Sequence, residues 1–361
     1  MEDFPDNNPE PEIDDDSVII EPEEAEIEGD FEGGEHLQLC VGMGIRQRRL
    51  DKYLNGRFGQ FSRTTIQRLI KEQGVTVNGK PAKASQKLNP KDLVDLIVPP
   101  RPVRELVPED IPLDVIYEDE SIIVINKQAN IICHPARGNT HGTLVNALVF
   151  HANKIATVGE DFRPGIVHRL DRNTTGVMVV AKDEVAHWRI SKQFHDRTTR
   201  KSYLAITHGC PELDGDCINQ PLGVHPGRRE KYAIRHDIGK EAITFYEVLE
   251  RFKGFALVHV KPRTGRTHQI RIHLAHIKNP IVADDMYGGK LVYPWQMENR
   301  EPAVEEPIIS RCALHAWQLE ITHPETNERM KFEAPLPPDM QLMLEELRKY
   351  RCLKKVKQQV V

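Results

Sequence analysis

Runs of apolar residues separated by short amphipathic segments dominate the chain after residue 108. The runs at 115–117, 122–125, 176–181 and 255–260 predict strands, and the apolar spacing at 142–151 and 184–194 predicts helices. Strands interspersed with short, irregularly placed helices favour an α+β domain around an antiparallel or mixed sheet. We expect this domain to span residues 108–345.

A different pattern predicts a small module at residues 45–100. The apolar residues of two short helices recur at helical spacing, namely Leu50, Tyr53 and Leu54 in the first and Ile66, Leu69 and Ile70 in the second. Ser62 can cap the second helix. A strand at 75–77 then enters Asn78-Gly79, a strong hairpin signal, and 93–98 resembles a closing strand.

The segments around these domains differ from them in charge. The first 45 residues hold sixteen Asp or Glu and no Lys or Arg, which predicts a disordered acidic tail at 1–44. We favour a solvating role for this tail, and the alternative is that the tail acts as an internal polyanion that competes for the basic surface. The prolines at 99–102 predict a linker at 101–107. Residues 346–361 are expected to form a basic C-terminal tail.

Charge changes the picture of the small module. The whole chain carries −5, but the part after the tail has 38 acidic and 49 basic residues and so carries +11. Eight Lys or Arg lie between Arg46 and Lys71 with one acid, Asp51. Most of these bases fall off the apolar stripes and would share an exposed face. Such a face is either a solvated helical surface or a phosphate-binding one, and the concentration of charge favours binding.

Length and composition fit a soluble chain of two domains, with 361 residues, 39% hydrophobic and 29% charged. No segment approaches the roughly 18 uncharged apolar residues of a membrane span, and the acidic N-terminus does not resemble a secretory signal. The six scattered cysteines never form C-x-x-C, which disfavours a disulfide scaffold or zinc ribbon. We therefore expect a cytoplasmic protein without membrane association.

Motifs for common cofactors are absent from the sequence. No Gly-Lys pair continues as a P-loop, and Gly42-Met43-Gly44 does not follow a predicted strand. His268 and His273 are five residues apart and do not stack on one helix face, and no third ligand accompanies His273 and His276. We expect no cofactor and no metal. A metal-dependent hydrolase that uses the histidines is kept as an alternative.

Two polar segments carry the candidate chemistry. Residues 165–176 lead into the strand at 176–181, where a loop can project a carboxylate into a cleft. In residues 264–274, Thr267 can cap a helix on which His268 and Arg271 share a face near the N-terminus, an arrangement that suits anions. The expected apolar face of this helix is Ile270, Leu274 and Ile277. Taken singly, these segments could equally be a salt-bridged turn and a basic helix end.

Together the segments resemble the RluA-type family of RNA pseudouridine synthases, in the RluC/RluD-like branch that has an RNA-binding module in front. The matching motifs stand in the family's order: His168-Arg169-Leu170-Asp171 with Thr174-Thr175-Gly176, Arg200 to Ala205, Gly265 to His273, Pro280 to Asp284 with Tyr287-Gly288, and Leu314-His315-Ala316. Thr175 replaces the usual Ser, and Lys127-Gln128-Ala129-Asn130 replaces Lys-Pro-Ala-Gly.

The module is similar to the αL-type RNA-binding domain first named for a small-subunit ribosomal protein. The matching residues are Arg49-Leu50-Asp51, Ser62-Arg63, Ile66 and Gly74 to Gly79. The resemblance implies binding of structured RNA, largely by shape and backbone. For the large domain it implies a catalytic sheet that is mixed and mainly antiparallel.

The resemblance also implies a reaction in which the N1–C1′ bond of uridine breaks, the uracil turns and C5 bonds to C1′, without a cofactor. Asp171 would supply the catalytic carboxylate after base flipping, by attack on the sugar or the ring or by removal of the C2′ proton. Arg271 would pair with it, and Tyr203 would pack on the base. Arg169 would fill the space of the flipped nucleotide or pair with a phosphate.

Further roles follow from the same resemblance. RNA contacts are expected from Arg49, Arg63, Arg68, Arg266 and His268, and structural roles in the site from His168, Thr175 and Gly176. The expected partner of this monomer is large-subunit (23S) ribosomal RNA in a ribosome precursor, with transfer RNA as an alternative. A non-catalytic RNA-binding protein of ribosome assembly is a further alternative, against which the intact Asp171, Tyr203 and Arg271 argue.

Overall fold

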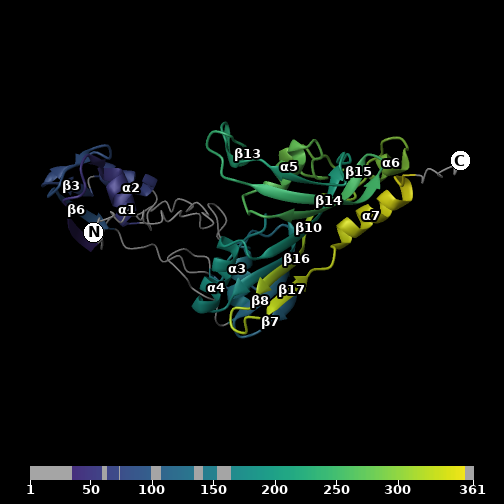
Figure 1. The fold of residues 1–361 in the computed structure, drawn as a ribbon, viewed down its shortest axis with the longest axis horizontal. Helices are drawn as coiled ribbons and strands as arrows, with labels where there is room; N and C mark the ends of the chain where they lie inside the picture. The colour runs from purple at the N-terminus through teal and green to yellow at the C-terminus, as the bar shows by residue number, and fades with distance from the viewer. Residues whose placement is uncertain are drawn as a thin grey trace, which may run out of the picture. The chain divides into compact units, whose positions relative to one another are not determined.

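The fold is that of a computed structural model, which describes residues 35–58, 63–72, 74–98, 107–133, 141–152 and 164–353. These residues divide into two compact units, one ending at Val98 and the other beginning at Val107 (Figure 1). The predicted linker at 101–107 lies outside the described residues except for Val107, and so do residues 1–34 of the predicted tail.

The N-terminal unit joins two short helices and a small antiparallel sheet in one apolar core. The sheet has the strand order β1-β6-β3-β4, and β2 pairs with β5. The elements are β1 (Glu35–Cys40), β2 (Arg48–Arg49), α1 (Leu50–Arg57), α2 (Arg63–Lys71), β3 (Val75–Val77), β4 (Lys80–Pro81), β5 (Lys87–Leu88) and β6 (Leu93–Val98). The six apolar residues predicted for the two helices are all buried.

The turn between β3 and β4 is the predicted Asn78-Gly79 hairpin. Asn78 (φ +52°) and Gly79 (φ +74°) both adopt the left-handed conformation that a type I′ turn requires. The Asn78 side chain also accepts a hydrogen bond of 2.9 Å from the backbone N–H of Leu93, which ties the turn to β6. The predicted helix cap Ser62 lies outside the described residues, and α2 begins at Arg63.

Strand β1 corrects the prediction that the acidic tail reaches residue 44. Glu35 to Cys40 pair antiparallel with β6, with Glu35 opposite Val98 and Cys40 opposite Leu93. Leu37 and Leu39 pack against the core of the unit. Apolar residues therefore alternate with polar ones along this edge strand, and the excess of acids in the segment as a whole concealed that alternation.

The C-terminal unit is an α+β domain around one large sheet, as expected. Its elements are β7 (Val115–Glu118), β8 (Ile122–Lys127), α3 (Leu144–His151), β9 (Thr175–Ala181), α4 (Glu184–His195), β10 (Arg200–His208), β11 (Gly215–Asn219), β12 (Leu222–His225), β13 (Arg228–Ile234), β14 (Ile243–Phe252), β15 (Phe255–Pro262), α5 (Gln269–His276), the 3-10 helix η1 (Asp285–Tyr287), α6 (Pro294–Glu298), β16 (Leu314–Thr322), β17 (Arg329–Glu333) and α7 (Pro338–Tyr350).

The large sheet is mixed and mainly antiparallel, which confirms the expected architecture. In the described part of the chain it has the order β11-β14-β15-β10-β16-β9-β8-β7, and β17 pairs with β16 beside this path. β16 and β9 run parallel, whereas the other neighbours within this sheet run antiparallel. The separate hairpin of β12 and β13 extends next to α5 (Figure 1).

Strands β8 and β9 are buried on both faces, which explains their nearly continuous apolar sequence. Alternate residues of β8 enter different cores: Ile122 and Val124 pack with residues of α4, and Ile123 and Ile125 pack with residues of α3. All residues of β9 are buried. The start of β9 is therefore held firmly, and with it the end of the loop that carries the first polar segment.

Helix α7 corrects the predicted domain boundary at residue 345. Met343 and Leu347 on this helix are fully buried in a core that includes residues of β14 and β15. The backbone of Cys352 still forms an isolated antiparallel β-bridge with that of Phe252. The first residues of the predicted basic tail therefore belong to the folded domain, because α7 continues its apolar face beyond the expected end. Residues 354–361 lie outside the described residues.

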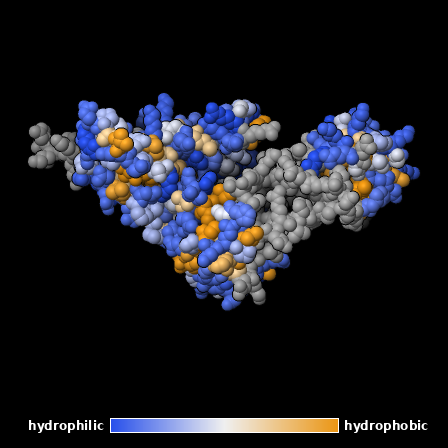
Figure 2. Space-filling model, turned by 180° about the vertical axis from the view of Figure 1, so that it is seen from behind, coloured by the Kyte–Doolittle hydropathy of each residue, from blue (hydrophilic) through white to orange (hydrophobic). Residues whose placement is uncertain are grey.

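Exposed apolar side chains are spread over several elements. They include Trp188 on α4, which is 64% exposed, and Phe150 on α3, which is 53% exposed. Figure 2 shows one face of the molecule as mainly hydrophilic, with apolar residues in separate groups. Among the described helices, none combines the length and the apolar character needed to cross a membrane.

Candidate active site

Asp171 lies in the loop that leads into β9. Arg271, on α5 in the second polar segment (residues 264–274), contacts it. The Asp171 side chain is 25% exposed, and its Oδ2 accepts a hydrogen bond of 3.1 Å from Arg271 Nη1. Thr174 N–H donates to the carbonyl of Asp171 at 3.1 Å and closes a turn. The expected pairing of two side chains 100 positions apart is therefore present.

Arg271 is shared between two carboxylates. Its Nε and Nη2 each donate to Asp284 at 2.8 Å, and the Asp284 side chain is only 1% exposed. Burial lowers the pKa of Arg271, but the hydrogen bonds of Asp284 and the charges of Asp171 and Asp284 outweigh it and the net shift is upward. The guanidinium stays charged, and Nη1 remains available to Asp171.

The cap of α5 differs from the predicted one. The helix begins at Gln269, its N-cap position is His268 rather than Thr267, and the His268 side chain makes no capping hydrogen bond. Instead, Gln269 Oε1 accepts a hydrogen bond of 3.0 Å from the backbone N–H of Arg266. A side chain inside the helix thus satisfies the amide of a residue that precedes it, Arg266. The predicted apolar face still contacts the core through Ile270, Leu274 and Ile277.

His268 also faces Asp171. Its Nε2 lies 3.9 Å from Asp171 Oδ2, and its Nδ1 lies 2.8 Å from the hydroxyl of Tyr287. Burial lowers the pKa of His268, although the charge of Asp171 opposes the shift. The imidazole is therefore neutral at pH 7, and Asp171 is approached by one neutral and one charged group from the same helix end.

Tyr203 lies on β10, opposite Val260 on β15 and Ala316 on β16. Its ring packs against two of the cores of the domain. Burial raises the pKa of Tyr203, and the nearby charge of Asp171 raises it further. The phenol is therefore protonated at neutral pH and lies within electrostatic range of the carboxylate.

Thr175 and Gly176 hold the start of β9 against β16. Gly176 has φ +116°, and a Cβ at this position would lie 2.1 Å from the carbonyl oxygen of Ala316, so a side chain does not fit. Thr175 Oγ1 lies 2.9 Å from His315 Nδ1, and the other nitrogen of His315 bonds the carbonyl of Ala334. These contacts support structural roles for Thr175 and Gly176.

A buried lysine that the sequence analysis did not select also holds the loop. Lys127, which is 1% exposed, donates to the carbonyls of Arg172 at 3.1 Å and Thr174 at 3.0 Å. Burial lowers the pKa of Lys127 to about 8, so most of the ammonium is charged at pH 7. It begins the segment that departs from the family pattern, in which Asn130 adopts φ +63° where glycine is usual. A lysine ending an apolar strand was the available signal.

Arg311 completes this support and was also missed. Its Nη1 donates to the carbonyl of Asn173 at 3.2 Å, while Nε and Nη2 each donate to Asp339 on α7 at 2.7 Å. Asp284 and Tyr287 stood in a family motif, but no role was predicted for either. Their partners come from other segments, so no local pattern could have identified them.

Replacing Lys127 with Met tests this support for the loop. Lys127→Met is expected to lower the unfolding midpoint and turnover together, because it leaves buried carbonyls without a donor at about 1–3 kcal/mol each. Lys182→Met is the matched control, since Lys182 follows the opposite end of β9 and pairs with Glu118 at 3.1 Å. Thermal unfolding and an assay of turnover measure both effects. If both variants lose the same turnover for each degree by which their unfolding midpoint falls, Lys127 has no specific role in the loop.

The other residues predicted near Asp171 have distinct surroundings. Arg169 is exposed and makes no hydrogen bond or ion pair with any described residue. His168 Nε2 accepts a hydrogen bond of 3.1 Å from the backbone of Val179, and its ring stacks on Phe194 at 4.4 Å. Burial lowers the pKa of His168 to about 3, so it is neutral. Arg266 Nε donates to the carbonyl of Glu241 at 3.0 Å.

The three predicted RNA contacts of the small module belong to the N-terminal unit. Arg49 pairs with the fully buried Asp51 at 2.9 Å but is itself 40% exposed. Arg68 on α2 lies 3.9 Å from Glu72, which is four positions later and just beyond the end of the helix. Arg63 begins α2, and its side chain lies outside the described part of the structure. Arg49 and Arg68 are thus partly neutralised by neighbouring carboxylates.

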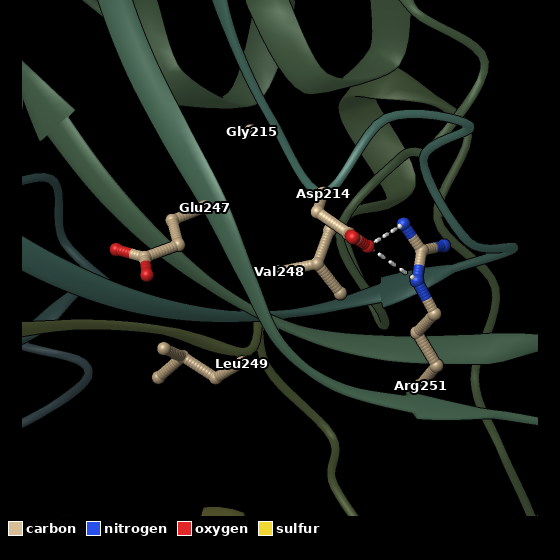
Figure 3. Close-up of a pocket in the computed structure, with 6 residues that line it drawn as sticks. All are labelled: Asp214, Gly215, Glu247, Val248, Leu249 and Arg251. Atoms are coloured by element: carbon tan, nitrogen blue, oxygen red, sulfur yellow. Dashed lines mark hydrogen bonds and ion pairs between the residues drawn. The ribbon is translucent and has the colours of Figure 1, made fainter.

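Two other features lie apart from these residues. A pocket beside β11 and β14 is lined by Asp214, Gly215, Glu247, Val248, Leu249 and Arg251. Figure 3 shows Arg251 bonded to Asp214, with Glu247 directed away from this pair. None of the residues predicted for the site lines it. His273 bonds Thr244 and the carbonyl of Gln220, and no three potential metal ligands come together among the described residues.

Comparison with known families gives two matches along the chain. A family model described as RNA pseudouridylate synthase matches residues 121–276, and a model of the S4 domain matches residues 48–94. The first range contains Asp171, Tyr203 and Arg271, and the second contains Arg49, Arg63 and Arg68.

Similar proteins match most of the chain. The ribosomal large subunit pseudouridine synthase D of Escherichia coli is 39% identical over 87% of this chain and 95% of its own length. The protein of the same name from Pseudomonas aeruginosa is 41% identical over 84% and 93%. An uncharacterized RNA pseudouridine synthase of Bacillus subtilis is 38% identical over 84% and 95%. The solved structure of human RNA Pseudouridylate Synthase Domain Containing 4 has a TM-score of 0.50 and 27% identity, covering 65% and 93%.

Proposed function

The chain belongs to the RNA pseudouridine synthase family, and on that premise we propose that it isomerises uridines of large-subunit (23S) ribosomal RNA with Asp171 as the catalytic group. The observation that carries this proposal is the Asp171–Arg271 pair at 3.1 Å. Asp171 lies in a loop whose carbonyls are bonded by Lys127 and Arg311, and its own side chain stays 25% exposed. The names of the similar proteins from Escherichia coli and Pseudomonas aeruginosa support the ribosomal substrate.

The surroundings of Asp171 support its role as the reacting carboxylate. Arg271 Nη1 is bonded to one carboxylate oxygen, Oδ2, and no described residue donates to Oδ1. An oxygen of this kind can attack the sugar or the ring of the target nucleotide, or take the C2′ proton. Because Arg271 also neutralises the buried Asp284, it offsets the cost of keeping charges in a site that a bound nucleotide would shield from water.

Two neighbours fit the handling of the target nucleotide. Uracil must leave its stack to reach Asp171, which costs a few kcal/mol in a duplex and less in a loop. Arg169, which is exposed and has no partner among the residues that the structure describes, is available to occupy the vacated space or to pair with a phosphate. Tyr203, with its ring against the cores and its pKa raised by burial and by Asp171, is suited to pack on the base as a neutral phenol.

The N-terminal unit is proposed as the RNA anchor, and the C-terminal unit as the catalytic domain. Arg48, Lys52, Arg57 and Lys71 are exposed on or beside α1 and α2. Each phosphate contact that they make would contribute to the salt dependence of binding. The six cysteines are free thiols, which supports a reducing, cytoplasmic setting. That the protein acts as a monomer stays a prediction.

Removing the N-terminal unit separates binding from chemistry. Deletion of residues 35–98 is expected to weaken RNA affinity at least about tenfold at 0.1 M salt and to reduce the slope of log affinity against log salt by about 0.9 per lost phosphate contact. Single-turnover conversion at saturating enzyme should persist. The charge variant Lys52→Gln with Lys71→Gln is the milder control. Unchanged affinity and slope after the deletion would show that the anchor lies elsewhere.

The proposed reaction is tested directly by following the hydrogen at C5 of uridine. Joining C5 to C1′ displaces that hydrogen, so a 23S ribosomal RNA transcript made with [5-³H]uridine should release tritium to water when the protein acts. Mapping of modified positions in RNA from cells lacking the protein then identifies the uridines. Loss of modification only in transfer RNA would overturn the ribosomal assignment, and no tritium release from either RNA would overturn the reaction.

A further inference from the structure

Tyr287, at the end of η1, connects several elements around the site. Its hydroxyl lies 2.8 Å from His268 Nδ1 and accepts a hydrogen bond of 3.2 Å from the backbone N–H of Tyr232 on β13. The guanidinium of Arg271 and the ammonium of Lys231 each lie 5.0 Å from the centre of its ring. The proposed function gives this residue no part, although it contacts both side chains that approach Asp171.

In the Tyr287–His268 hydrogen bond, the tyrosine hydroxyl is the donor and the imidazole is the acceptor. The amide of Tyr232 can only donate, so it uses a lone pair of the phenol oxygen. The hydroxyl proton then has one acceptor among the described residues, the Nδ1 atom of His268. A neutral imidazole that accepts at Nδ1 carries its own proton on Nε2. Nε2 lies 3.9 Å from Asp171 Oδ2, which is too long for a direct hydrogen bond.

Two further observations indicate that this arrangement is specific. His268 adopts the left-handed conformation with φ +56°, which is uncommon for a residue other than glycine and recurs at functional sites. Burial lowers the pKa of His268 against the opposing charge of Asp171, and Arg271 lowers it further. The ring is therefore held neutral in an unusual backbone conformation beside the reacting carboxylate.

We propose that Tyr287 is a positioning residue that fixes the His268 tautomer with the proton on Nε2, so that this N–H donates to a carbonyl oxygen of the flipped uracil beside Asp171. The proposal rests on the proposed function. Each of the three possible roles of Asp171 moves electron density from the breaking or attacked bond onto the uracil oxygens. An N–H donor fixed in advance stabilises that density without reorganising during the reaction.

The tautomer is tested without RNA in the full-length protein. In ¹⁵N-histidine NMR spectra at pH 8, the His268 signals should show a protonated Nε2 and an unprotonated Nδ1 in the wild type. Tyr287→Phe keeps the ring between the two cations but removes the hydroxyl, so the Nδ1–H form should gain population. A wild-type ring protonated on Nδ1 would overturn the proposal.

The catalytic consequence is measured by tritium release from the same 23S transcript. Tyr287→Phe should lower kcat about tenfold, the loss of roughly one hydrogen bond, while KM changes less than about twofold. Tyr117→Phe is the matched control, because Tyr117 donates to Asp119 at 2.8 Å on β7 outside the site. His268→Gln retains an amide donor of similar reach and should keep more kcat than His268→Asn, which suits the left-handed backbone but is shorter.

The outcomes separate this inference from the proposed function. Equal kcat in Tyr287→Phe and Tyr117→Phe, with an active wild type, would overturn the role of Tyr287 and leave the reaction standing. Equal loss in His268→Gln and His268→Asn would overturn donation by His268. Absence of turnover in the wild type on both ribosomal and transfer RNA would instead contradict the proposed function.

Discussion

Asp171→Asn is expected to abolish tritium release from [5-³H]uridine-labelled 23S transcript, a loss of at least about 10³-fold. The amide has nearly the shape of the carboxylate, and its oxygen can still accept from Arg271 Nη1. The amide cannot act as the anionic nucleophile or base that breakage of the N1–C1′ bond requires. The fold and the affinity for RNA should therefore persist while the chemistry stops.

The matched control for this variant is Asp284→Asn, at the other carboxylate on Arg271. It should retain measurable turnover with reduced stability, since Asp284 supports Arg271 rather than the nucleotide. Unfolding midpoints and RNA-binding isotherms must be measured alongside turnover. Turnover by Asp171→Asn at more than a tenth of the wild-type rate would remove Asp171 from the catalytic role.

Arg271→Ala is expected to lose both turnover and stability. The substitution leaves the Asp284 carboxylate buried without its bidentate partner. Removing one member of a buried ion pair typically lowers the free energy of unfolding by about 3–5 kcal/mol. It also removes the group that orients Asp171. Chemical denaturation should show a lower midpoint for the unit that holds α5, and tritium release should fall in samples kept at a temperature where the variant is still folded.

A double substitution distinguishes the two losses. In Arg271→Ala with Asp284→Asn the unpaired buried charge is removed, so part of the stability should return. Turnover should remain low, because Asp171 still lacks its cation. Recovery of turnover together with stability would show that Arg271 acts only by maintaining the fold.

The sequence pattern predicted the elements of the structure well where local signals were strong. The Asn78-Gly79 turn followed from the demand for two positive φ angles, which few residues other than asparagine and glycine meet. The strands predicted from the apolar runs at 122–125 and 176–181 are observed at 122–127 and 175–181, where they are buried on both faces. Strand β1 was missed because the prediction considered the charge of residues 1–44 as a whole. The alternation of apolar and polar residues at 35–40 was therefore overlooked.

The candidate site divides in the same way. Asp171, His268 and Arg271 were selected because they stand in two polar segments, before a buried strand and at a basic helix start, that together resemble the motifs of the family. Lys127, Arg311, Asp284 and Tyr287 were not assigned roles, because what defines them is a partner elsewhere in the chain. Lys127, for example, bonds a carbonyl 47 residues away, and Arg311 bonds one 138 residues away.

By itself, the sequence predicted the fold class and the two folded units, and its motifs resembled the family and marked Asp171 as the candidate catalytic residue. Periodicity and turn geometry act over a few residues, so they are legible along the chain. The tertiary structure alone decided which groups hold the Asp171 loop from behind, how Arg271 is divided between two carboxylates and which nitrogen of His268 faces them. Those arrangements depend on packing between distant segments, where the favourable geometry is set by the shared core and not by any local pattern.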